Sequence, residues 1–401
     1  MIRTLKNFVH LCIGFTANCI YLFPSRSMKV IGVTGTDGKT TTATLLYEIL
    51  TAYGYKVGML TTVSAIINGK SYDTGFHVTT PNPFALQKCL ALAKKAGVEY
   101  FILETTSHAL DQNRVFGIHY AVSAITNISS EHLDYHKTYE AYVKAKAKII
   151  AMSTTVVLNK DDKSYSYILE LKAKSTKLKN KKCITFGLNT DADINPEKYP
   201  IKPSMPGEFN LYNSLAAIAV CLQLGIEYKT VKGTIETYKA PIGRQDIVTH
   251  SPFTVMIDFA HTPHAFHALL SSLRSEYLGN IIHVFGSAGQ RDHEKRPEMG
   301  KISSQFADRI ILTAEDPRNE KVKEIIEQIA EGISKKFTVE DTTFLYKIPD
   351  RREAIEFALS IATKGDIVVI TGKGHEQSMN FGNGEVQWSD HAAVKEAFKK
   401  L

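Results

Sequence analysis

The chain has 401 residues, which is longer than one ordinary hydrophobic core supports and predicts two or three domains. Its 44% hydrophobic and 22% charged residues are typical of a globular protein and exclude a disordered or fibrous chain. The formal net charge of +7 is mild for this length. It suits small anionic substrates such as nucleotides, and we expect no nucleic-acid partner.

Two further features of the composition have plain interpretations. The lysine-rich segment 172–182 is interpreted as a solvated helix end followed by a loop. The cysteines are odd in number and lack CxxC spacing, so neither a disulfide framework nor a zinc site is expected, and a reducing cytoplasm is the predicted location. The five cysteines are Cys12, Cys19, Cys89, Cys183 and Cys221.

Residues 1–28 resemble a signal peptide at first reading, because Arg3 and Lys6 precede an apolar run over residues 8–23. A nucleotide-binding strand is expected from residue 29, which leaves almost no room for a processed end. The run is short for a spanning helix, and polar residues and a glycine interrupt it. We predict a packed or interfacial helix, with weak membrane-surface contact through residues 1–28 as the alternative.

From residue 29 strands and helices alternate, as in an α/β domain with a mainly parallel sheet. Each buried strand ends in polar residues, where open α/β sheets place ligands. Strands are predicted at 29–33, 100–103, 122–125 and 155–158, and helices at 41–53, 83–96, 139–151 and 211–224.

A second alternating series begins after residue 241. Strands are predicted at 254–257, 281–285, 309–313 and 367–370, and helices at 264–277, 321–335 and 351–363. The sequence therefore predicts an α/β fold with a short helical segment at 1–28, a central P-loop-type domain at 29–240 and a C-terminal Rossmann-like domain at 241–401.

A glycine-rich segment, GTDGKTTT at residues 35–42, lies between the first predicted strand and helix. The backbone N–H groups of such a loop surround phosphate oxygens, while Lys39 reaches the β- and γ-phosphates and Thr40 offers a hydroxyl to Mg²⁺. The common spacing requires a glycine where Val33 stands, and a glycine turn capping a helix is the alternative interpretation. The predicted ATP-binding loop consists of Gly35, Thr36, Asp37, Gly38, Lys39, Thr40 and Thr41.

Eleven motifs occur in an order that resembles the Mur ligase family. They are GTDGKTTT, TTPNPFALQ (79–87), ETTSHALDQNRV (104–115), TNISSEHLDYH (126–136), YVKAKAKII (142–150), GEFNLYNSLAA (207–217), GRQDIV (243–248), DFAHTPHA (258–265), GSAGQRDHEKRP (286–297), EDPRNE (315–320) and GKGHEQ (372–377). The match is most similar to the enzymes that add the third amino acid to the UDP-N-acetylmuramoyl dipeptide of peptidoglycan. The resemblance implies an ATP-dependent ligase that acts as a monomer.

The resemblance also implies a metal site. Thr40 and the phosphates would hold one Mg²⁺, and Glu104 and His132 a second. Lys146, on the helix that also carries Lys144 and Lys148, would be carbamylated and position the metal as a carboxylate does. A buried lysine with a lowered pKa is the form that reacts with CO₂. The implied catalytic residues are Lys39, Glu104, His132 and Lys146.

Further contacts follow from the matched motifs. The amides of Asn127, Asn210 and Asn213 can hydrogen-bond adenine. Arg244, Asp258 and His261 are expected at the phosphates and ribose of ATP, and residues 291–296 are either a further nucleotide contact or a charged loop. The acceptor-binding residues are Thr79, Thr80, Ser107 and Arg114, and the amino-acid-binding residues are Asp316, Arg318, Gly372 and Glu376.

Two departures from the family bear on the substrates. Relatives specific for meso-diaminopimelate carry DNPR where this chain has Glu315-Asp316-Pro317-Arg318. Arg318 is retained and its guanidinium suits a carboxylate, so diaminopimelate is favoured over L-lysine, although Asp316 adds a negative charge. Three-domain relatives have roughly a hundred residues ahead of the loop, a small-domain size, that bind UDP. Here residues 1–28 stand in that place.

The expected reaction begins when the acceptor carboxylate attacks the γ-phosphate of ATP. An acyl phosphate forms, and the amine of the incoming amino acid displaces phosphate to give an amide. Lys39, two Mg²⁺ ions and domain closure would supply charge and orientation. The alternatives are a ligase similar to folylpolyglutamate synthase and a non-catalytic nucleotide-binding scaffold.

Overall fold

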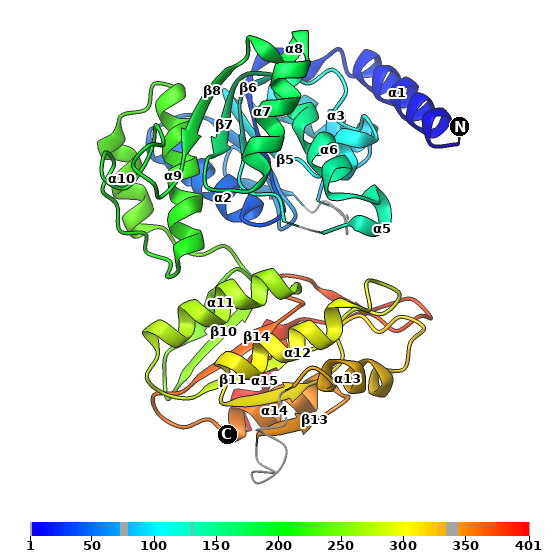
Figure 1. Ribbon diagram of the computed structural model, residues 1–401, viewed down its shortest axis with the longest axis vertical. Helices are drawn as coiled ribbons and strands as arrows, with labels where there is room; N and C mark the ends of the chain where they lie inside the picture. Colours follow the sequence, from blue (N-terminus) through cyan, green and yellow to red (C-terminus); the bar gives the residue numbers. More distant parts are fainter. Residues whose placement is uncertain (1, 73–78, 130, 334–343, 401) are drawn as a thin grey trace. The chain divides into compact units, whose positions relative to one another are not determined.

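The structure is a computed structural model that describes residues 2–72, 79–129, 131–333 and 344–400. It divides into two compact units, Met1–Ser204 with Phe209–Lys239, and Met205–Glu208 with Ala240–Leu401. Each unit contains one large sheet (Figure 1). Among the described residues, no helix combines the length and the apolarity that crossing a bilayer requires.

The first unit contains an eight-stranded sheet. Its strands are β1 (Lys29–Thr34), β2 (Val57–Leu60), β3 (Ala65–Ile67), β4 (Lys70–Tyr72), β5 (Tyr100–Glu104), β6 (Tyr120–Ile125), β7 (Ser153–Asn159) and β8 (Lys182–Phe186). The spatial order is β4-β3-β2-β5-β1-β6-β7-β8. The strands from β2 to β8 in this order are parallel, and β3 and β4 add an antiparallel edge.

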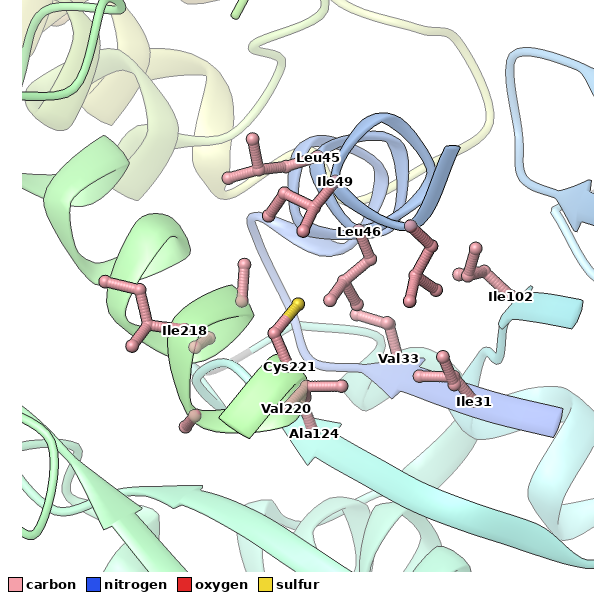
Figure 2. Packing of buried hydrophobic residues seen from close by; sticks show 14 of the residues in the cluster. Ile31, Val33, Leu45, Leu46, Ile49, Ile102, Ala124, Ile218, Val220 and Cys221 are labelled. Carbon is pink, nitrogen blue, oxygen red and sulfur yellow. The ribbon is translucent and has the colours of Figure 1, made fainter. Parts of the chain in front are cut away.

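Helices cover both faces of this sheet because its strands are apolar on both sides. The helices are α1 (Ile2–Ile20), η1 (Pro24–Ser27), α2 (Lys39–Ala52), α3 (Pro83–Lys95), α4 (Ser107–Asp111), α5 (Leu133–His136), α6 (Tyr139–Ala151), α7 (Ser164–Lys174), α8 (Thr176–Lys179), α9 (Glu208–Gln223) and α10 (Tyr228–Thr237). Ile31 and Val33 of β1 pack against α2 and α9, as Figure 2 shows. Val30 faces the opposite core, which α3, α6 and α7 complete.

The strand register brings several carboxyl ends together at one edge of the sheet. Val33 at the end of β1 is paired with Glu104 of β5, and Thr34 with Ile125 of β6. The polar segments that follow these strands therefore share the edge from which α2 departs. This is where parallel α/β sheets bind ligands.

The second unit repeats the layered plan with a six-stranded sheet. Its strands are β9 (Asp246–Thr249), β10 (Thr254–Asp258), β11 (Ile281–Phe285), β12 (Arg309–Leu312), β13 (Leu345–Lys347) and β14 (Ile367–Thr371), in the order β13-β12-β11-β14-β10-β9. Only β9 is antiparallel to its neighbour. A separate pair, β15 (Ser378–Asn380) and β16 (Glu385–Gln387), is antiparallel. The helices are α11 (Pro263–Glu276), α12 (Lys295–Phe306), α13 (Val322–Ala330), α14 (Arg351–Ser360) and α15 (Asp390–Phe398).

The predicted fold class is confirmed, and the differences concern short or atypical elements. The loop predicted at the end of the lysine-rich segment 172–182 is wrong, because α8 and the start of β8 lie there. The predicted helix 211–224 begins earlier, at Glu208 of α9. The predicted helix 321–335 corresponds to the shorter α13, which ends at Ala330; predicted positions 334 and 335 lie outside the described residues. Residues 291–296 are not only a loop, because α12 begins at Lys295.

Candidate functional site

The glycine-rich segment forms the turn from β1 into α2. Gly38 has φ 77°, and a Cβ added there would lie 2.1 Å from the Oδ1 atom of Asn213, so no other residue fits without displacing that side chain. No side chain caps the start of α2. Its first N–H groups are therefore available to an anion, and the helix dipole favours negative charge at the same place.

Residues that follow β6 brace this loop. The backbone N–H of Asp37 donates to Asn127 Oδ1 at 2.9 Å, and Asn127 Nδ2 donates to the carbonyl of Asp37 at 3.2 Å. The Thr126 hydroxyl donates to the same carbonyl at 2.6 Å. The amide of Asn127 thus holds the phosphate loop, and its predicted contact with adenine stays a prediction.

The other two asparagines predicted at adenine lie on α9 and are buried. Asn213 Nδ2 donates to Asn210 Oδ1 at 3.3 Å, and Asn213 Oδ1 accepts from the Thr42 hydroxyl at 3.4 Å. Both therefore support the start of α2 from the side. Lys39 Nζ donates to the carbonyl of Thr36 at 2.7 Å, so its ammonium lies over the loop.

Thr40 and Glu104 lie together, as predicted for metal ligands. The Thr40 hydroxyl donates to Glu104 Oε2 at 2.9 Å, and the carboxylate is buried. Thr62, which the sequence did not single out, is a third member. Its N–H donates to Glu104 Oε2 at 3.1 Å, and its hydroxyl lies 3.1 Å from Oε1. Thr62 follows β2, a strand that was not predicted, so no sequence signal pointed to it.

Lys146 lies on the buried face of α6, whereas Lys144 and Lys148 are exposed. Its Nζ atom donates to the carbonyl of Gly35 at 2.5 Å and lies 4.7 Å from the centre of the Tyr142 ring. Burial, with the nearby charge of Lys39, lowers the pKa of Lys146 well below its ordinary value. The structure thus separates Lys146 from its neighbours, which the alternation of lysines in the sequence could not do.

His132 reaches the same region from the loop before α5. It has φ 55°, its ring centre lies 6.1 Å from that of Tyr142, and its Nε2 atom lies 3.8 Å from Glu131 Oε2. Among the described residues, no group of three or more histidine, cysteine, aspartate and glutamate side chains is placed to hold a metal. Thr40 and Glu104 contact each other, and metal binding by Thr40, Glu104, His132 and Lys146 stays a prediction.

The predicted acceptor residues border Glu104. The Thr79 hydroxyl lies 2.9 Å from that of Thr62, and the Thr80 hydroxyl donates to the carbonyl of Glu104 at 3.0 Å. Arg114 donates through Nη1 to the carbonyl of Thr80 at 2.9 Å. These hydrogen bonds link Arg114 through Thr80 to Glu104 at the end of β5.

Ser107, the fourth predicted acceptor residue, lies at the start of α4. Its hydroxyl lies 3.0 Å from Nε2 of His136, and both side chains are buried. Burial, together with the neighbouring His108, lowers the pKa of His136 to about 4, so this imidazole is neutral at physiological pH.

In the second unit, the residues predicted at the phosphates and ribose surround the end of β10. Asp258 accepts from the N–H of Gln245 at 2.7 Å and from the N–H of Ala260 at 2.6 Å. The Arg244 guanidinium lies 4.3 Å from the centre of the Phe259 ring. His261 Nδ1 lies 2.8 Å from the Phe259 carbonyl. Their predicted contact with ATP stays a prediction.

The charged segment 291–296 has a structural member that the sequence interpretation missed. Arg296 is fully buried, although every residue of the segment was considered for either a solvated loop or a nucleotide contact. Its guanidinium donates to Glu320 Oε2 at 2.8 Å, to Gln328 Oε1 at 2.6 Å and to the carbonyl of Ala288 at 3.0 Å. Arg296 therefore holds this segment to α13 and the loop before it.

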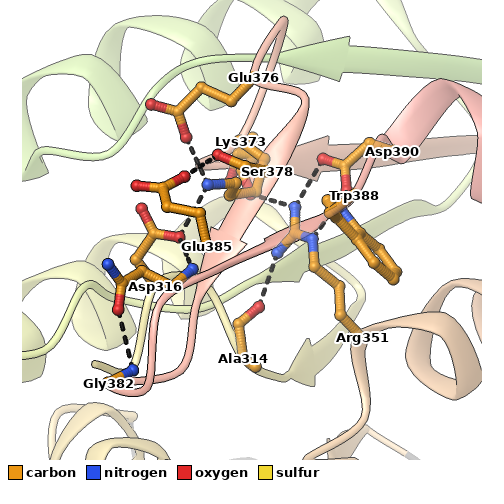
Figure 3. Close-up of polar contacts among 12 residues, drawn as sticks. Ala314, Asp316, Arg351, Lys373, Glu376, Ser378, Gly382, Glu385, Trp388 and Asp390 are labelled. Atoms are coloured by element: carbon orange, nitrogen blue, oxygen red, sulfur yellow. Dashed lines mark hydrogen bonds and ion pairs between the residues drawn. The ribbon is translucent and has the colours of Figure 1, made fainter. Parts of the chain in front are cut away.

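The predicted amino-acid site lies beyond β12 and β14, as Figure 3 shows. Lys373 Nζ is 2.8 Å from Asp316 Oδ1 and 2.5 Å from Glu376 Oε2. Asp316 also accepts from the N–H of Asn380 at 3.0 Å. The negative charge that Asp316 introduces is thus paired inside the protein, and Lys373 was not among the predicted site residues.

Gly372 and Arg318 complete this region. Gly372 has φ 104°, and a Cβ there would lie 2.6 Å from Oε2 of the buried Glu315. Burial raises the pKa of Glu315, and Lys295 opposes that rise. Arg318 is half-buried with φ 52°, and within the part of the chain that the structure describes its guanidinium has no hydrogen-bond or ion-pair partner.

Together, a glycine-rich turn with an uncapped helix start on one α/β unit and a charged strand-end cluster on a second are typical of a two-unit nucleotide-dependent α/β protein. The sequence matches the Mur ligase middle domain over residues 33–221 and the Mur ligase glutamate ligase domain over residues 243–374. The chain belongs to the Mur ligase family.

Curated relatives match most of the chain. UDP-N-acetylmuramoyl-L-alanyl-D-glutamate--2,6-diaminopimelate ligase 1 of Clostridium acetobutylicum is 35% identical over 94% of this chain and 80% of its own length. The UDP-N-acetylmuramoyl-L-alanyl-D-glutamate--2,6-diaminopimelate ligase of Aquifex aeolicus is 36% identical over 96% of this chain and 80% of its own length. The predicted family is therefore confirmed.

Solved structures agree on the fold. A structure of a UDP-N-acetylmuramoyl-L-alanyl-D-glutamate--2,6-diaminopimelate ligase, 28% identical, matches with a TM-score of 0.63 over 93% of this chain and 78% of that chain. The folylpolyglutamate synthase of Mycobacterium tuberculosis with ADP and AMPPCP matches with a TM-score of 0.72 over 90% of this chain and 92% of that chain. At 20% identity, this second likeness shows the shared fold alone.

Proposed function

We propose that this chain joins a diamino acid to the free carboxylate of a UDP-N-acetylmuramoyl dipeptide at the expense of ATP, with diaminopimelate preferred over L-lysine. The observation that carries the proposal is the burial of Lys146 beneath the phosphate loop, hydrogen-bonded to Gly35 and without a carboxylate hydrogen bond among the described residues. The names of the curated relatives support the choice of substrates.

The proposal gives Lys146 a chemical role. Its neutral amine attacks CO₂, a C–N bond forms, and one proton leaves, so that an uncharged side chain becomes an anion with two oxygen ligands. With Thr40, Glu104 and His132, this carbamate completes a set that would hold two Mg²⁺ ions. Bound Mg²⁺ would neutralise charge on the triphosphate and on the acyl phosphate.

The protein's own groups orient the two anions that must meet. Lys39 and the open N–H groups of α2 would bind the β- and γ-phosphates of ATP. Thr80, Ser107 and Arg114 would bind the acceptor so that its carboxylate approaches the γ-phosphate. Little covalent chemistry falls to these residues, since positioning and charge stabilisation account for most of the rate in phosphoryl transfer.

The amino-acid end favours a substrate with a second carboxylate. Arg318 offers a guanidinium that no other described residue engages, and a fork of N–H donors suits a carboxylate. Asp316 does not oppose that carboxylate strongly, because Lys373 pairs with it. Gly372 and Glu376 would meet the amino group near the same carboxylate.

The test uses the full chain with ATP, Mg²⁺ and the UDP-muramoyl dipeptide, and offers diaminopimelate and L-lysine separately. We expect an ATP-dependent product, formed with release of ADP and phosphate, whose mass is that of the dipeptide plus diaminopimelate minus water, and we expect it to form faster than the lysine product. Product only with a folate and glutamate would replace the proposal by a folylpolyglutamate synthase activity. ATP binding without product from any pair would indicate a scaffold.

A further inference from the structure

Helix α1 exposes an apolar stripe to solvent. Within residues 7–20 the exposed positions recur at helical spacing, and Thr16 is the one polar member among them. The exposed positions are Phe8, Val9, Cys12, Phe15, Thr16, Cys19 and Ile20. Phe8 and Ile20 are each 61% exposed, and Leu22 beyond the helix is 76% exposed. Large apolar side chains contiguous in this way mark an interaction surface.

The opposite face of α1 is fixed to the first unit by specific contacts. Asn18 is fully buried, and its Nδ2 atom donates to the carbonyls of Gly14 at 2.9 Å and Phe116 at 2.7 Å. Asn113 Nδ2 donates to the carbonyl of Asn7 at 3.3 Å. The helix also packs against α3 (Figure 1). Because a polar asparagine holds the buried face, the helix cannot rotate its apolar stripe inward without losing these bonds.

The segment that carries the stripe is basic in sequence. Residues 1–36 contain no aspartate or glutamate, and the basic residues among them are Arg3, Lys6, Arg26 and Lys29. Helix α3 likewise has no acidic residue, and Lys88, Lys94 and Lys95 on it are exposed. A basic segment that carries an apolar stripe, packed against a helix whose charged residues are all lysines, is complementary to an anionic lipid surface.

We propose that α1 lies in the interface of a membrane rich in anionic lipids, with its axis in the plane and Phe8, Phe15 and Ile20 among the acyl chains. From Phe8 to Ile20 the stripe extends for roughly 20 Å at the helical rise, which suits an interfacial helix. A second copy of the chain is disfavoured as the occupant, because two such helices would bring only like charges together at their ends. This proposal does not rest on the proposed ligase activity, so the two proposals are tested independently.

The test measures cosedimentation of the full chain with vesicles of phosphatidylcholine and phosphatidylglycerol in equal parts, and with phosphatidylcholine alone. We expect binding to the anionic vesicles that weakens with salt, since the surface potential is screened. Phe8→Glu with Ile20→Glu should weaken binding at least about a hundredfold, because two apolar anchors are lost and charge is reversed. Arg3→Gln with Lys6→Gln should weaken binding roughly twenty-five-fold, at about fivefold for each basic residue.

Leu278→Glu is the matched control, because Leu278 is a fully exposed apolar residue of the second unit. It should leave vesicle binding unchanged, and circular dichroism should show the same helix content for every variant. The proposal is overturned if the full chain binds neither vesicle, if it binds both equally, or if Phe8→Glu with Ile20→Glu binds as the unaltered chain does. Light scattering that shows a dimer abolished by the same double substitution would assign the stripe to a second copy instead.

Discussion

Lys146 of the first unit and Arg351 of the second are both buried cations, and the two are held in opposite ways. In the second unit, Arg351 of α14 makes two hydrogen bonds to Asp390, at 2.8 and 2.7 Å, and donates to the carbonyls of Ala314 and Thr371 (Figure 3). In the first unit, the ammonium of Lys146 donates a hydrogen bond to the carbonyl of Gly35 and lies over the ring of Tyr142. The charge of Arg351 is therefore paired with a carboxylate, whereas the described hydrogen bond of Lys146 is to a neutral carbonyl.

The pKa values move in opposite directions for this reason. Burial acts to lower the pKa of both groups, but Asp390 outweighs it and raises the pKa of Arg351. Among the described residues no carboxylate is hydrogen-bonded to Lys146, and burial with Lys39 outweighs the charges of Glu131, Asp37 and Glu104 and lowers the pKa of Lys146. A buried cation with a complete set of partners is a structural device, whereas one without them marks a site prepared for chemistry. We infer from this comparison that Arg351 contributes to stability in the second unit, and we propose that Lys146 contributes to reactivity in the first.

The largest expected effect follows from removing Lys146. Lys146→Ala should lower the ligation rate by at least about a thousandfold, since oriented charge at a phosphoryl-transfer site contributes that order of rate. Added bicarbonate should not restore it. Lys144→Ala is the control on the same helix, because Lys144 is exposed. Near-normal turnover of Lys146→Ala, measured as product by mass, would remove the lysine from the mechanism.

Removing Arg351 should act on stability instead. Arg351→Met leaves Asp390 buried without its partner and should lower the free energy of unfolding of the second unit by about 3–5 kcal/mol. The only tryptophan, Trp388, donates to Asp390 Oδ1, so its fluorescence follows this unit in denaturant.

The matched variant for this pair is Arg351→Met with Asp390→Leu. It should recover most of the lost stability, because the buried charge is removed together with its partner. A double variant no more stable than Arg351→Met would show that the hydrogen bonds of Arg351 to the two carbonyls, and not the ion pair, hold α14 in place.

A neutral buried histidine extends the comparison to pH. Burial, with Arg351 nearby, lowers the pKa of His283 to about 3, and its ring lies 2.9 Å from the hydroxyls of both Ser303 and Thr371. The folded-state pKa is below the unfolded value of about 6.5, so the unfolded chain binds more protons between these values and stability falls as the pH falls. The expected slope is about 1.4 kcal/mol per pH unit in that window.

His283→Gln removes this titration and retains hydrogen-bonding groups. Its free energy of unfolding, followed by Trp388 fluorescence, should fall less steeply than that of the unaltered chain between pH 6.5 and about 3. Parallel pH profiles for the two proteins would mean that His283 does not titrate on unfolding.

The smallest expected effect concerns Thr62, which orients Glu104 without belonging to the predicted metal ligands. Thr62→Val removes the hydroxyl beside Glu104 Oε1 and should lower the ligation rate about tenfold and raise the Mg²⁺ concentration needed, as loss of a group supporting a metal ligand does. Thr62→Ser, which keeps the hydroxyl, should restore most of the rate. Equal ligation rates for Thr62→Val and Thr62→Ser would show that the Thr62 hydroxyl does not orient Glu104 and that the side chain only fills space.

The sequence was sufficient for the fold class, and it selected several residues that the structure brings together at the end of β5. Buried parallel strands give continuous apolar runs, so β1, β5, β6 and β7 could be recognised, and ordered motifs selected Glu104 and Lys146. The short antiparallel edge strands β3 and β4 could not be recognised, since three residues carry no reliable period. Thr62 and Lys373 were missed for a related reason: their roles arise from contacts between distant segments, Glu104 with Thr62 and Asp316 with Lys373.

Alternating lysines on α6 illustrate the remaining limit. The motif selected Lys146, but only packing shows that it points inward beneath Gly35 while Lys144 and Lys148 face solvent. Arg296 shows the reverse case, because a charged run that resembles a solvated loop contains a fully buried arginine. Whether Lys146 and Arg296 are buried depends on the whole fold, so the sequence alone could not show it.

The most direct test of the central claim is a ¹³C NMR spectrum of the full chain with ¹³C-labelled bicarbonate and Mg²⁺. The account predicts a carbamate carbonyl signal that is present in the unaltered protein and in Lys144→Ala and absent in Lys146→Ala. Absence of the signal from the unaltered protein, or its persistence in Lys146→Ala, would contradict the claim that the buried lysine is prepared for carbamylation.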